Sequence, residues 1–496
     1  MASAFRLAVS ACIALVGAGV IVAVPVAPPA PRVAMRDVRL TSGDDVGLVV
    51  GGSGIPIPQL VTDYVEDAGK FITLPNVSPD ATDIHGVFTP EGLSPLYSGV
   101  KSLPFNVSVA EGTTVLVSDI KDEIAAGNTV TLYGESQSST IAGFVMSNLQ
   151  ADDIPAKDVT FVLVADPSLP DGGMLERFDG LTLPSLGITF SGATPPDTIY
   201  DTVIYTQEYD GFADFPKYPI DFLSDLNAVL GIEYVHPTYR AVIADDPSAV
   251  ADALKAGTTP QYTLSPGYDG TTSYYLIPTQ EGLPSSLPSL DDALPLLRPF
   301  ESIPLIGKPL VDLLNPDLTQ LVNLGYDNPA NYGWDVGPAN VPTQFGLLPP
   351  FDQIVTAIKN LVPGTEEGMS AAMSDVHAEM AAFMANPLGG LSTGAAPTEL
   401  ISALSPTDIF NDLTNAIETL ANDFSSTYAL LLPTADVATA VLFSLPAYDL
   451  SLFADNIFTN PLDAVGLPVA ADIGLTTVGA GFLGFTVLET LGSLAP

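Results

Sequence analysis

The sequence predicts an α/β protein with a central, largely parallel sheet, on three observations. Apolar segments of strand length alternate along the chain with segments whose apolar residues recur at helical spacing. Residues 159–164 (VTFVLV) are apolar without alternation, which is typical of a strand covered on both faces. A strand, a sharp turn and a helix also follow one another between residues 129 and 149. Alternating strands and helices favour parallel strands with helices packed over the sheet.

The individual elements are predicted in chain order. Residues 46–50 (VGLVV) form a short strand that ends in a glycine-rich loop at residues 51–54. Residues 107–124 are helix-rich, and residues 129–133 (TVTLY) form a β-branched strand. The following helix shows apolar residues at Ile141, Phe144, Val145 and Leu149. The strand at 159–164 comes next, then a strand at 202–209 that ends at Asp210, and a helix at 223–230.

Two proline- and glycine-rich stretches, residues 167–198 and 283–316, are predicted to be loops or caps on the sheet. From about Phe351 the pattern becomes helical, which predicts a mainly helical C-terminal region. Within it, residues 405–408 (SPTD) have the form of a capped helix start. Residues 387–397 (PLGGLSTGAAP) are the best candidate linker.

Composition excludes several functions. The chain has 496 residues, of which 57 are acidic and 15 are Lys or Arg, so its net charge is −42. Nucleic-acid binding is excluded, because it depends on Lys and Arg that neutralise phosphates. With 47% apolar and only 15% charged residues, the chain is expected to fold. The single cysteine, Cys12, leaves no disulfide, cysteine zinc site or thiol mechanism to the folded part.

Both ends of the chain carry long apolar runs. At the N-terminus, Arg6, the uncharged residues 7–24 and a proline-rich stretch have the order of a signal sequence, so export is expected. The 18-residue run suits either a cleaved signal or a membrane anchor, and this choice stays open. Near the C-terminus, residues 473–488 are an uncharged run of 16 residues, too short for a comfortable membrane span. A packed or interfacial helix is expected there, and the favoured form is a core helix.

The segment Gly134–Ser138 (GESQS) has the setting of a nucleophile elbow, since it follows a strand and opens a helix. Such a turn strains the serine backbone, so the residues two before and two after it must be small. The N–H of Gln137 would then point at the carbonyl oxygen of an ester bound at Ser136. A second oxyanion donor is expected from the glycine-rich loop, at Ser53. The alternative is an ordinary capped turn between a strand and a helix.

A serine nucleophile needs a base and an acid that orients the base. Asp210 and His236 follow Ser136 in the Ser…Asp…His order of the α/β-hydrolase fold. Asp166 is a serious rival as the acid because it also ends a buried strand, and Asp214 is a weaker one.

The other two histidines are weaker candidates for the base. His377 lies in a helical pattern and is expected at the surface, and His85 is a candidate loop residue lining the cleft. Scattered histidines of this kind give no convincing metal site, and neither a metal nor a cofactor is expected.

Several ordered blocks resemble the PE-PPE domain of mycobacterial proteins, a family of serine α/β-hydrolases similar to cutinases and lipases. The blocks lie at residues 89–93 (TPEGL), 99–103 (GVKSL), 134–138 (GESQS), 170–173 (PDGG), 209–216 (YDGFADFP) and 274–278 (YYLIP). The resemblance covers roughly residues 45–330, and a serine at the last elbow position is usual in this family. It implies Ser136 as nucleophile, Asp210 as acid, His236 as base and fatty-acyl esters as substrates.

These expectations combine into one organisation and three candidate functions. Residues 1–40 are expected to be a signal peptide or membrane anchor, residues 41–345 a PE-PPE-like α/β-hydrolase domain, and residues 346–496 a helical C-terminal region. No PE or PPE module precedes the domain in this sequence, which favours export by a Sec-type signal. The expected function is an exported esterase or lipase, secreted or associated with the cell envelope or a membrane.

The alternatives are an acyltransferase that acylates trehalose-type glycolipids and a non-catalytic lipid-binding protein of the cell wall. Acyl chain length, the alcohol and the oligomeric state stay open.

Overall fold

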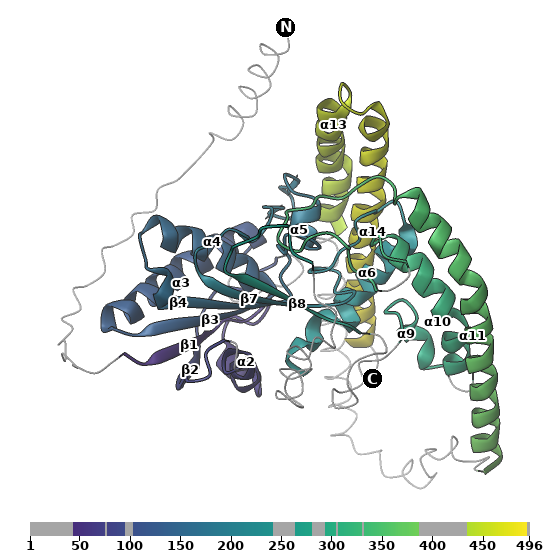
Figure 1. The fold of residues 1–496 in the computed structure, drawn as a ribbon, viewed down its shortest axis with the longest axis horizontal. Helices are drawn as coiled ribbons and strands as arrows, with labels where there is room; N and C mark the ends of the chain where they lie inside the picture. Colours follow the sequence, from purple (N-terminus) through teal and green to yellow (C-terminus); the bar gives the residue numbers. More distant parts are fainter. Residues whose placement is uncertain are drawn as a thin grey trace, which may run out of the picture. The chain divides into compact units, whose positions relative to one another are not determined.

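The centre of the protein is a six-stranded parallel sheet with the strand order β2-β1-β3-β4-β7-β8 (Figure 1). The computed structural model describes residues 43–74, 77–94, 103–241, 263–279, 293–303, 306–329, 332–385 and 434–493. The strands are β1 (Asp45–Val49), β2 (Asp83–Gly86), β3 (Thr129–Glu135), β4 (Val159–Val164), β7 (Asp201–Gln207) and β8 (Thr272–Ile277). The predicted strands at 46–50, 129–133, 159–164 and 202–209 are therefore confirmed, with small shifts at their ends.

Helices cover both faces of the sheet, which explains the continuous apolar strands. On one face lie α3 (Phe105–Ala126) and α4 (Gln137–Ala151), with Phe161 and Leu163 of β4 in the same core cluster. On the other face, α2 (Tyr64–Ile72) packs in a second cluster that contains Val162 and Val164. Because successive side chains of a strand point to opposite faces, β4 needs apolar residues on both of its faces.

The remaining elements connect these layers or follow them in the chain. They are η1 (Pro58–Leu60), η2 (Ala156–Asp158), α5 (Met174–Arg177), β5 (Thr182–Leu183), β6 (Ile188–Thr189), α6 (Phe222–Tyr234), η3 (His236–Thr238), α9 (Arg298–Glu301), α10 (Gly307–Leu324), α11 (Phe351–Ala385), η5 (Ala440–Ser444), α13 (Leu445–Asn456) and α14 (Pro461–Ser493). Strands β5 and β6 pair antiparallel in a small sheet of their own. The helical C-terminal region is confirmed, and α14 packs along α6 beside the main sheet.

Two expectations about loops need correction. The stretch 167–198 is not only loop, because it contains α5 and the β5–β6 pair. Residues 307–316, predicted as loop or cap, form the first half of α10. Pro309 lies in the first turn of α10, where its missing N–H removes no intrahelical bond. The predicted linker at 387–397, the helix start at 405–408 and the N-terminal residues 1–40 lie outside the described residues.

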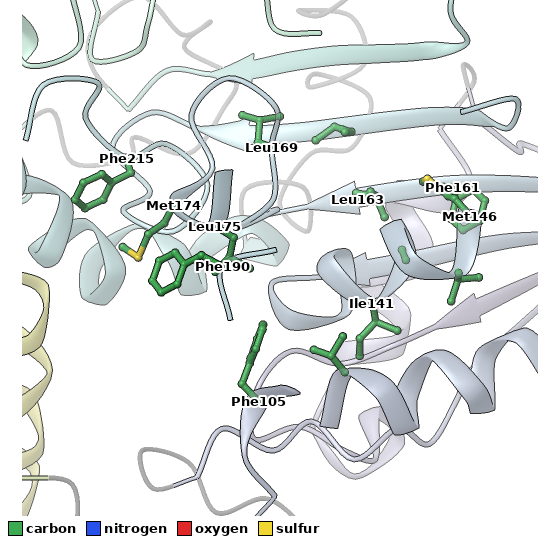
Figure 2. Packing of buried hydrophobic residues seen from close by; sticks show 14 of the residues in the cluster. Phe105, Ile141, Met146, Phe161, Leu163, Leu169, Met174, Leu175, Phe190 and Phe215 are labelled. Carbon is green, nitrogen blue, oxygen red and sulfur yellow. The ribbon is translucent and has the colours of Figure 1, made fainter. Parts of the chain in front are cut away.

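A single apolar cluster runs from the sheet to the loops beyond its carboxyl edge. Figure 2 shows Phe161, Leu163 and Met146 at one end, between strands and helices. At the other end the same cluster contains Met174 and Phe190, which come from the segment between β4 and β7. All strands of this sheet are parallel, and β1, β3, β4 and β7 follow one another in it. The carboxyl ends of β1, β3 and β7 therefore lie at the same edge. Ligands of open α/β sheets bind at such an edge.

Candidate active site

Ser136 lies in a strained turn between β3 and α4, with φ 60° and ψ −117°. A positive φ is uncommon for a residue with a side chain and costs free energy unless its surroundings hold it. A β-carbon at Gly134 would lie 2.9 Å from the carbonyl oxygen of Ser138, so only glycine fits there. The Ser138 hydroxyl accepts a hydrogen bond from the Glu135 N–H at 2.7 Å. Small residues on both sides of Ser136 therefore make the turn possible, as the sequence predicted.

Three side chains that the sequence singled out form one hydrogen-bonded series. The Ser136 hydroxyl lies 2.8 Å from Nε2 of His236. On the other side of the ring, Nδ1 of His236 lies 2.8 and 2.9 Å from the two carboxylate oxygens of Asp210. A carboxylate can only accept, so Nδ1 donates to Asp210 and Nε2 accepts from the serine hydroxyl. This tautomer is the one that a general base needs.

Further hydrogen bonds fix the orientation of Asp210. The chain leaves β7 at Gln207 and turns at Tyr209, which has a φ of 64°. The buried Asp210 carboxylate then accepts the N–H of Phe212 at 3.0 Å and the hydroxyl of Tyr239 at 2.7 Å. Tyr239 was missed by the sequence analysis. Its position three residues after His236 was the only sequence signal, and a tyrosine at that spacing is not diagnostic.

The surroundings of His236 act on its pKa in both directions. Burial lowers this pKa, whereas the charge and hydrogen bond of Asp210, and the charge of Glu135, raise it. The net effect is a pKa above the ordinary value for histidine. The interactions that raise this pKa would also stabilise an imidazolium formed by transfer of the Ser136 proton to the ring. A general base must begin neutral, so the fraction of protein in which His236 can accept a proton grows as the pH rises through this raised pKa.

The other candidate residues lie away from the Ser136 hydroxyl. Asp166 accepts hydrogen bonds from the Ser168 N–H at 2.9 Å and the Thr194 hydroxyl at 2.7 Å, and Asp214 accepts the N–H of Tyr209. His377 is exposed on α11, as expected.

The prediction that His85 lies in a loop lining the cleft was wrong. His85 is on β2, the edge strand, where it pairs with Leu48 of β1 and contacts the Asp83 carboxylate.

The two predicted oxyanion donors belong to adjoining segments. Gln137 opens α4, where the first N–H groups of a helix have no intrahelical partner. Its side chain donates to the Ser53 hydroxyl at 3.2 Å and to the Gly92 carbonyl at 2.9 Å, which connects the glycine-rich loop to α4. The loop also approaches the nucleophile closely, because a β-carbon at Gly52 would lie 3.3 Å from Cβ of Ser136.

An ion pair that the sequence analysis missed flanks the serine. Arg240 Nε donates to Oε2 of Glu135 at 3.1 Å, and the guanidinium lies 4.1 Å from the centre of the Tyr64 ring. The same carboxylate oxygen accepts the hydroxyls of Tyr64 at 2.9 Å and Tyr133 at 3.0 Å. Glu135 and Arg240 both line the cavity described next. They give the side of the cavity near Ser136 a polar, charged border.

Ser136 and His236 open into a cavity of about 450 Å³ with mostly apolar walls. The walls come from the segment between β4 and β7 and from the two C-terminal helices, including Met174, Phe190, Val441, Leu445, Val478 and Phe482. Phe482 also packs on Phe212, whose ring contacts His236 at a centroid distance of 4.8 Å. The sequence analysis assigned no site role to any residue after 345. Apolar residues at helical spacing predict a buried face, but they do not say what it covers.

Among the described residues, no group of three or more His, Cys, Asp or Glu side chains is arranged to hold a metal ion.

Comparisons with known proteins agree with this architecture. The family model of the PE-PPE domain matches residues 79–327, half of the chain. The chain is 39% identical over 477 residues to the uncharacterized PPE family protein PPE28 of Mycobacterium tuberculosis, covering 91% of this chain and 67% of that protein. It is also 39% identical over 315 residues to the esterase PE16 of the same organism, covering 63% of this chain and 53% of PE16.

A more distant relative is the diacyltrehalose acyltransferase Chp2 of M. tuberculosis, 28% identical over 279 residues, with 53% of this chain and 71% of Chp2 covered. The chain thus spans about two thirds of PPE28 and about half of PE16. The relatives named for an activity are named for ester hydrolysis or acyl transfer, which supports a lipid-ester hydrolase or acyltransferase in general terms. On the family match and the similarity to PPE28, the chain belongs to the PE-PPE domain family.

Proposed function

We propose that the protein is an exported serine esterase that hydrolyses fatty-acyl esters of the cell envelope. The observation that carries this proposal is the hydrogen-bonded series Ser136–His236–Asp210 at the mouth of an apolar cavity. The order of charged, apolar and proline-rich residues between positions 6 and 31 supports export. The similarity to the esterase PE16 supports the reaction class.

In the proposed mechanism, the Ser136 oxygen attacks the carbonyl carbon of the ester while its proton passes to Nε2 of His236. The negative oxygen that develops is stabilised by the N–H of Gln137 and a second donor from the loop at Ser53. The imidazolium, oriented by Asp210, then gives its proton to the departing alcohol as the C–O bond breaks. Water attacks the resulting acyl-enzyme by the same route, with His236 again as the base, and releases the fatty acid.

The apolar cavity would hold the acyl chain, so we expect Val478→Phe to select against long chains. Val478 is 8% exposed and lines the cavity from α14, so a phenyl ring there would reduce the space available for a long acyl chain. Each CH₂ group that loses burial costs about 0.8 kcal/mol, so excluding two of them lowers kcat/KM about tenfold or more. The measurement is kcat/KM for aryl esters of short and long fatty acids.

The matched control is Val469→Phe, the same substitution on the same helix at a residue that is 50% exposed. It should leave the chain-length preference unchanged. Circular dichroism checks that Val478→Phe is folded, and Val478→Ala should instead tolerate long chains. If Val478→Phe lowered turnover of short and long esters equally in a folded protein, the cavity would not be the acyl site.

A second candidate function, transfer of the acyl group to a sugar hydroxyl, is favoured by the charged border of the cavity. Glu135 and Arg240 offer acceptors and donors beside Ser136, where the alcohol side of the substrate must lie. The similarity to the diacyltrehalose acyltransferase Chp2 points the same way. Transfer requires an acceptor held near the acyl-enzyme at high effective concentration, whereas water reaches an open site without such a feature. Hydrolysis is therefore the first proposal.

Product analysis distinguishes the two reactions. The enzyme is incubated with an acyl donor and increasing trehalose or acylated trehalose, and released fatty acid is counted against newly acylated sugar. We expect fatty acid to dominate at every acceptor concentration. Acylated sugar dominating at millimolar acceptor would replace hydrolysis by transfer and leave the roles of Ser136, Asp210 and His236 unchanged.

A further inference from the structure

Residues 434–493 form a helical hairpin in which many apolar side chains are exposed and not packed against the protein. Its two helical stretches, Thr434–Asn456 and Pro461–Phe485, are long and apolar enough to cross a membrane by length and composition. Only 17% and 28% of their most apolar windows are buried. Figure 1 shows α13 and α14 side by side, joined by a turn at the end of the hairpin. Phe458, in that turn, is 94% exposed.

Only one face of the first helical stretch of the hairpin lines the cavity. Val437, Ala440, Val441 and Leu445, spaced as one helical face, line the cavity. The opposite side carries Leu442 and Phe443, which are exposed. Helices that are apolar on all sides are normally surrounded by other apolar material. Towards the turn, Leu450, Leu462 and Val465 are likewise exposed, and no described part of the protein covers them.

The charge of the hairpin restricts what can cover this surface. Residues 434–493 contain no Lys, Arg or His, and they carry Asp436, Asp449, Asp455, Asp463, Asp472 and Glu489. Anionic lipid headgroups attract Lys and Arg and repel acidic residues. An apolar layer with uncharged or zwitterionic headgroups therefore suits the hairpin, whereas an anionic one does not.

The base of the hairpin is held by the rest of the protein. Leu475 and Val478 are buried in the cavity wall, and α14 packs along α6. A β-carbon at Gly474, near the middle of α14, would touch Pro219, and one at Gly466, in the second turn of the same helix, would touch Leu347. Crossing a bilayer along the full length of both helices would remove these contacts. In the tip of the hairpin, which we define as residues 446–465, Tyr448 and Leu452 pack against the core and Ala464 is buried, so its exposed side chains are the part available for insertion.

We propose that the tip of the hairpin inserts into one leaflet of a lipid layer with uncharged or zwitterionic headgroups. Exposed Phe458, Leu450 and Leu462 enter the acyl region, and the acidic residues stay among the headgroups. Val441 lines the cavity, is itself 37% exposed and lies on the same helical stretch, Thr434–Asn456, as Leu450. Insertion of the tip would therefore hold the cavity-lining part of this stretch close to the lipid layer. The docking itself needs no catalysis, so it can be tested independently of the proposed esterase.

A tryptophan placed in the tip measures this insertion directly. The chain has a single tryptophan, Trp334, which is buried and stacked on Tyr332, so Phe458→Trp in the full chain adds a distinct exposed probe. With phosphatidylcholine vesicles we expect its emission to shift to shorter wavelength and to be quenched by brominated acyl chains. The matched control is Phe351→Trp at the start of α11, where Phe351 is 78% exposed. This control should show neither change, even if residues 7–24 hold the protein on the vesicle.

A second substitution tests the role of the neighbouring apolar residues. Adding Leu450→Asp to Phe458→Trp should reduce the quenching about tenfold at a fixed lipid concentration, since burying a leucine contributes a similar factor to partitioning. Val362→Asp on α11, at a residue of the same 67% exposure, should not reduce it. Vesicles that contain half phosphatidylglycerol should give weaker quenching at low salt.

Three results would overturn the proposal. The first is a tip probe that responds to phosphatidylcholine no more than the Phe351→Trp control. The second is stronger insertion into the anionic vesicles. The third is a blue shift that appears without lipid and grows with protein concentration, which would assign the tip to contact with a second copy of the chain. If the wild-type protein inserted as expected but turned over no ester, only the proposed function would be contradicted.

Discussion

Replacing Ser136 by alanine is expected to abolish ester turnover, with a loss on the order of 10⁴- to 10⁶-fold in kcat. The alanine keeps the backbone turn but removes the only atom that can form the acyl-enzyme. Among the described residues, Ser136 Oγ has His236 as its hydrogen-bond partner, so the substitution removes that bond and no bond to the backbone. The fold is therefore expected to be unchanged. Turnover of a short-chain aryl ester and a thermal unfolding curve measure both quantities.

Ser147→Ala is a suitable control, because Ser147 is an exposed serine further along α4 whose hydroxyl donates to the Gly143 carbonyl. It should retain full activity. An active-site phosphonate should label the wild-type protein and the Ser147→Ala variant, but not the Ser136→Ala variant. Near-normal turnover by Ser136→Ala would move the nucleophile elsewhere, and a wild-type protein that is neither labelled nor active would favour the non-catalytic lipid-binding alternative.

The parts of the fold that depend on residues close together in the sequence could be predicted from it. The unbroken apolar run at residues 159–164 needs cover on both faces, and β4 has α2 on one side and α3 with α4 on the other. The small residues Gly134 and Ser138 around Ser136 similarly predict a sharp turn, because a larger residue at 134 would collide with the chain. Both inferences concern residues close together in the sequence.

The parts that depend on distant segments could not be predicted in this way. His85 was expected in a loop because its neighbouring residues do not indicate a strand. Its segment is a strand through its pairing with β1, which is distant in the sequence. Part of the cavity wall comes from helices some 300 residues after Ser136, and a helical pattern there does not indicate what those helices pack against. Likewise, Asp166 and Asp210 both follow buried strands, and only the resemblance of residues 209–216 to a PE-PPE block favoured Asp210.

The second large expected effect concerns the acid of the triad. Asp210→Asn is expected to lower kcat far more than Asp166→Asn. An asparagine amide at 210 can donate to Nδ1 of His236, which favours the tautomer with its proton on Nε2. That tautomer cannot accept the proton of Ser136, and the corresponding loss in related triads is about 10⁴-fold. Asp166, by contrast, hydrogen-bonds Ser168 and Thr194 and has no bond to the imidazole.

Asp166→Asn should also be tolerated by the fold, because burial raises the pKa of Asp166 to about 6, against the smaller opposing effects of Thr194 and Ser168. A raised pKa means that burial disfavours the charged form, so an uncharged amide avoids this cost. The measurement is kcat and KM for both variants, with His236→Ala as the inactive reference and His85→Ala and His377→Ala as active ones. We expect the loss in Asp210→Asn to fall on kcat, because the cavity proposed to bind the acyl chain is unaltered. The opposite ranking, with Asp166→Asn the weaker enzyme, would assign the acid to Asp166.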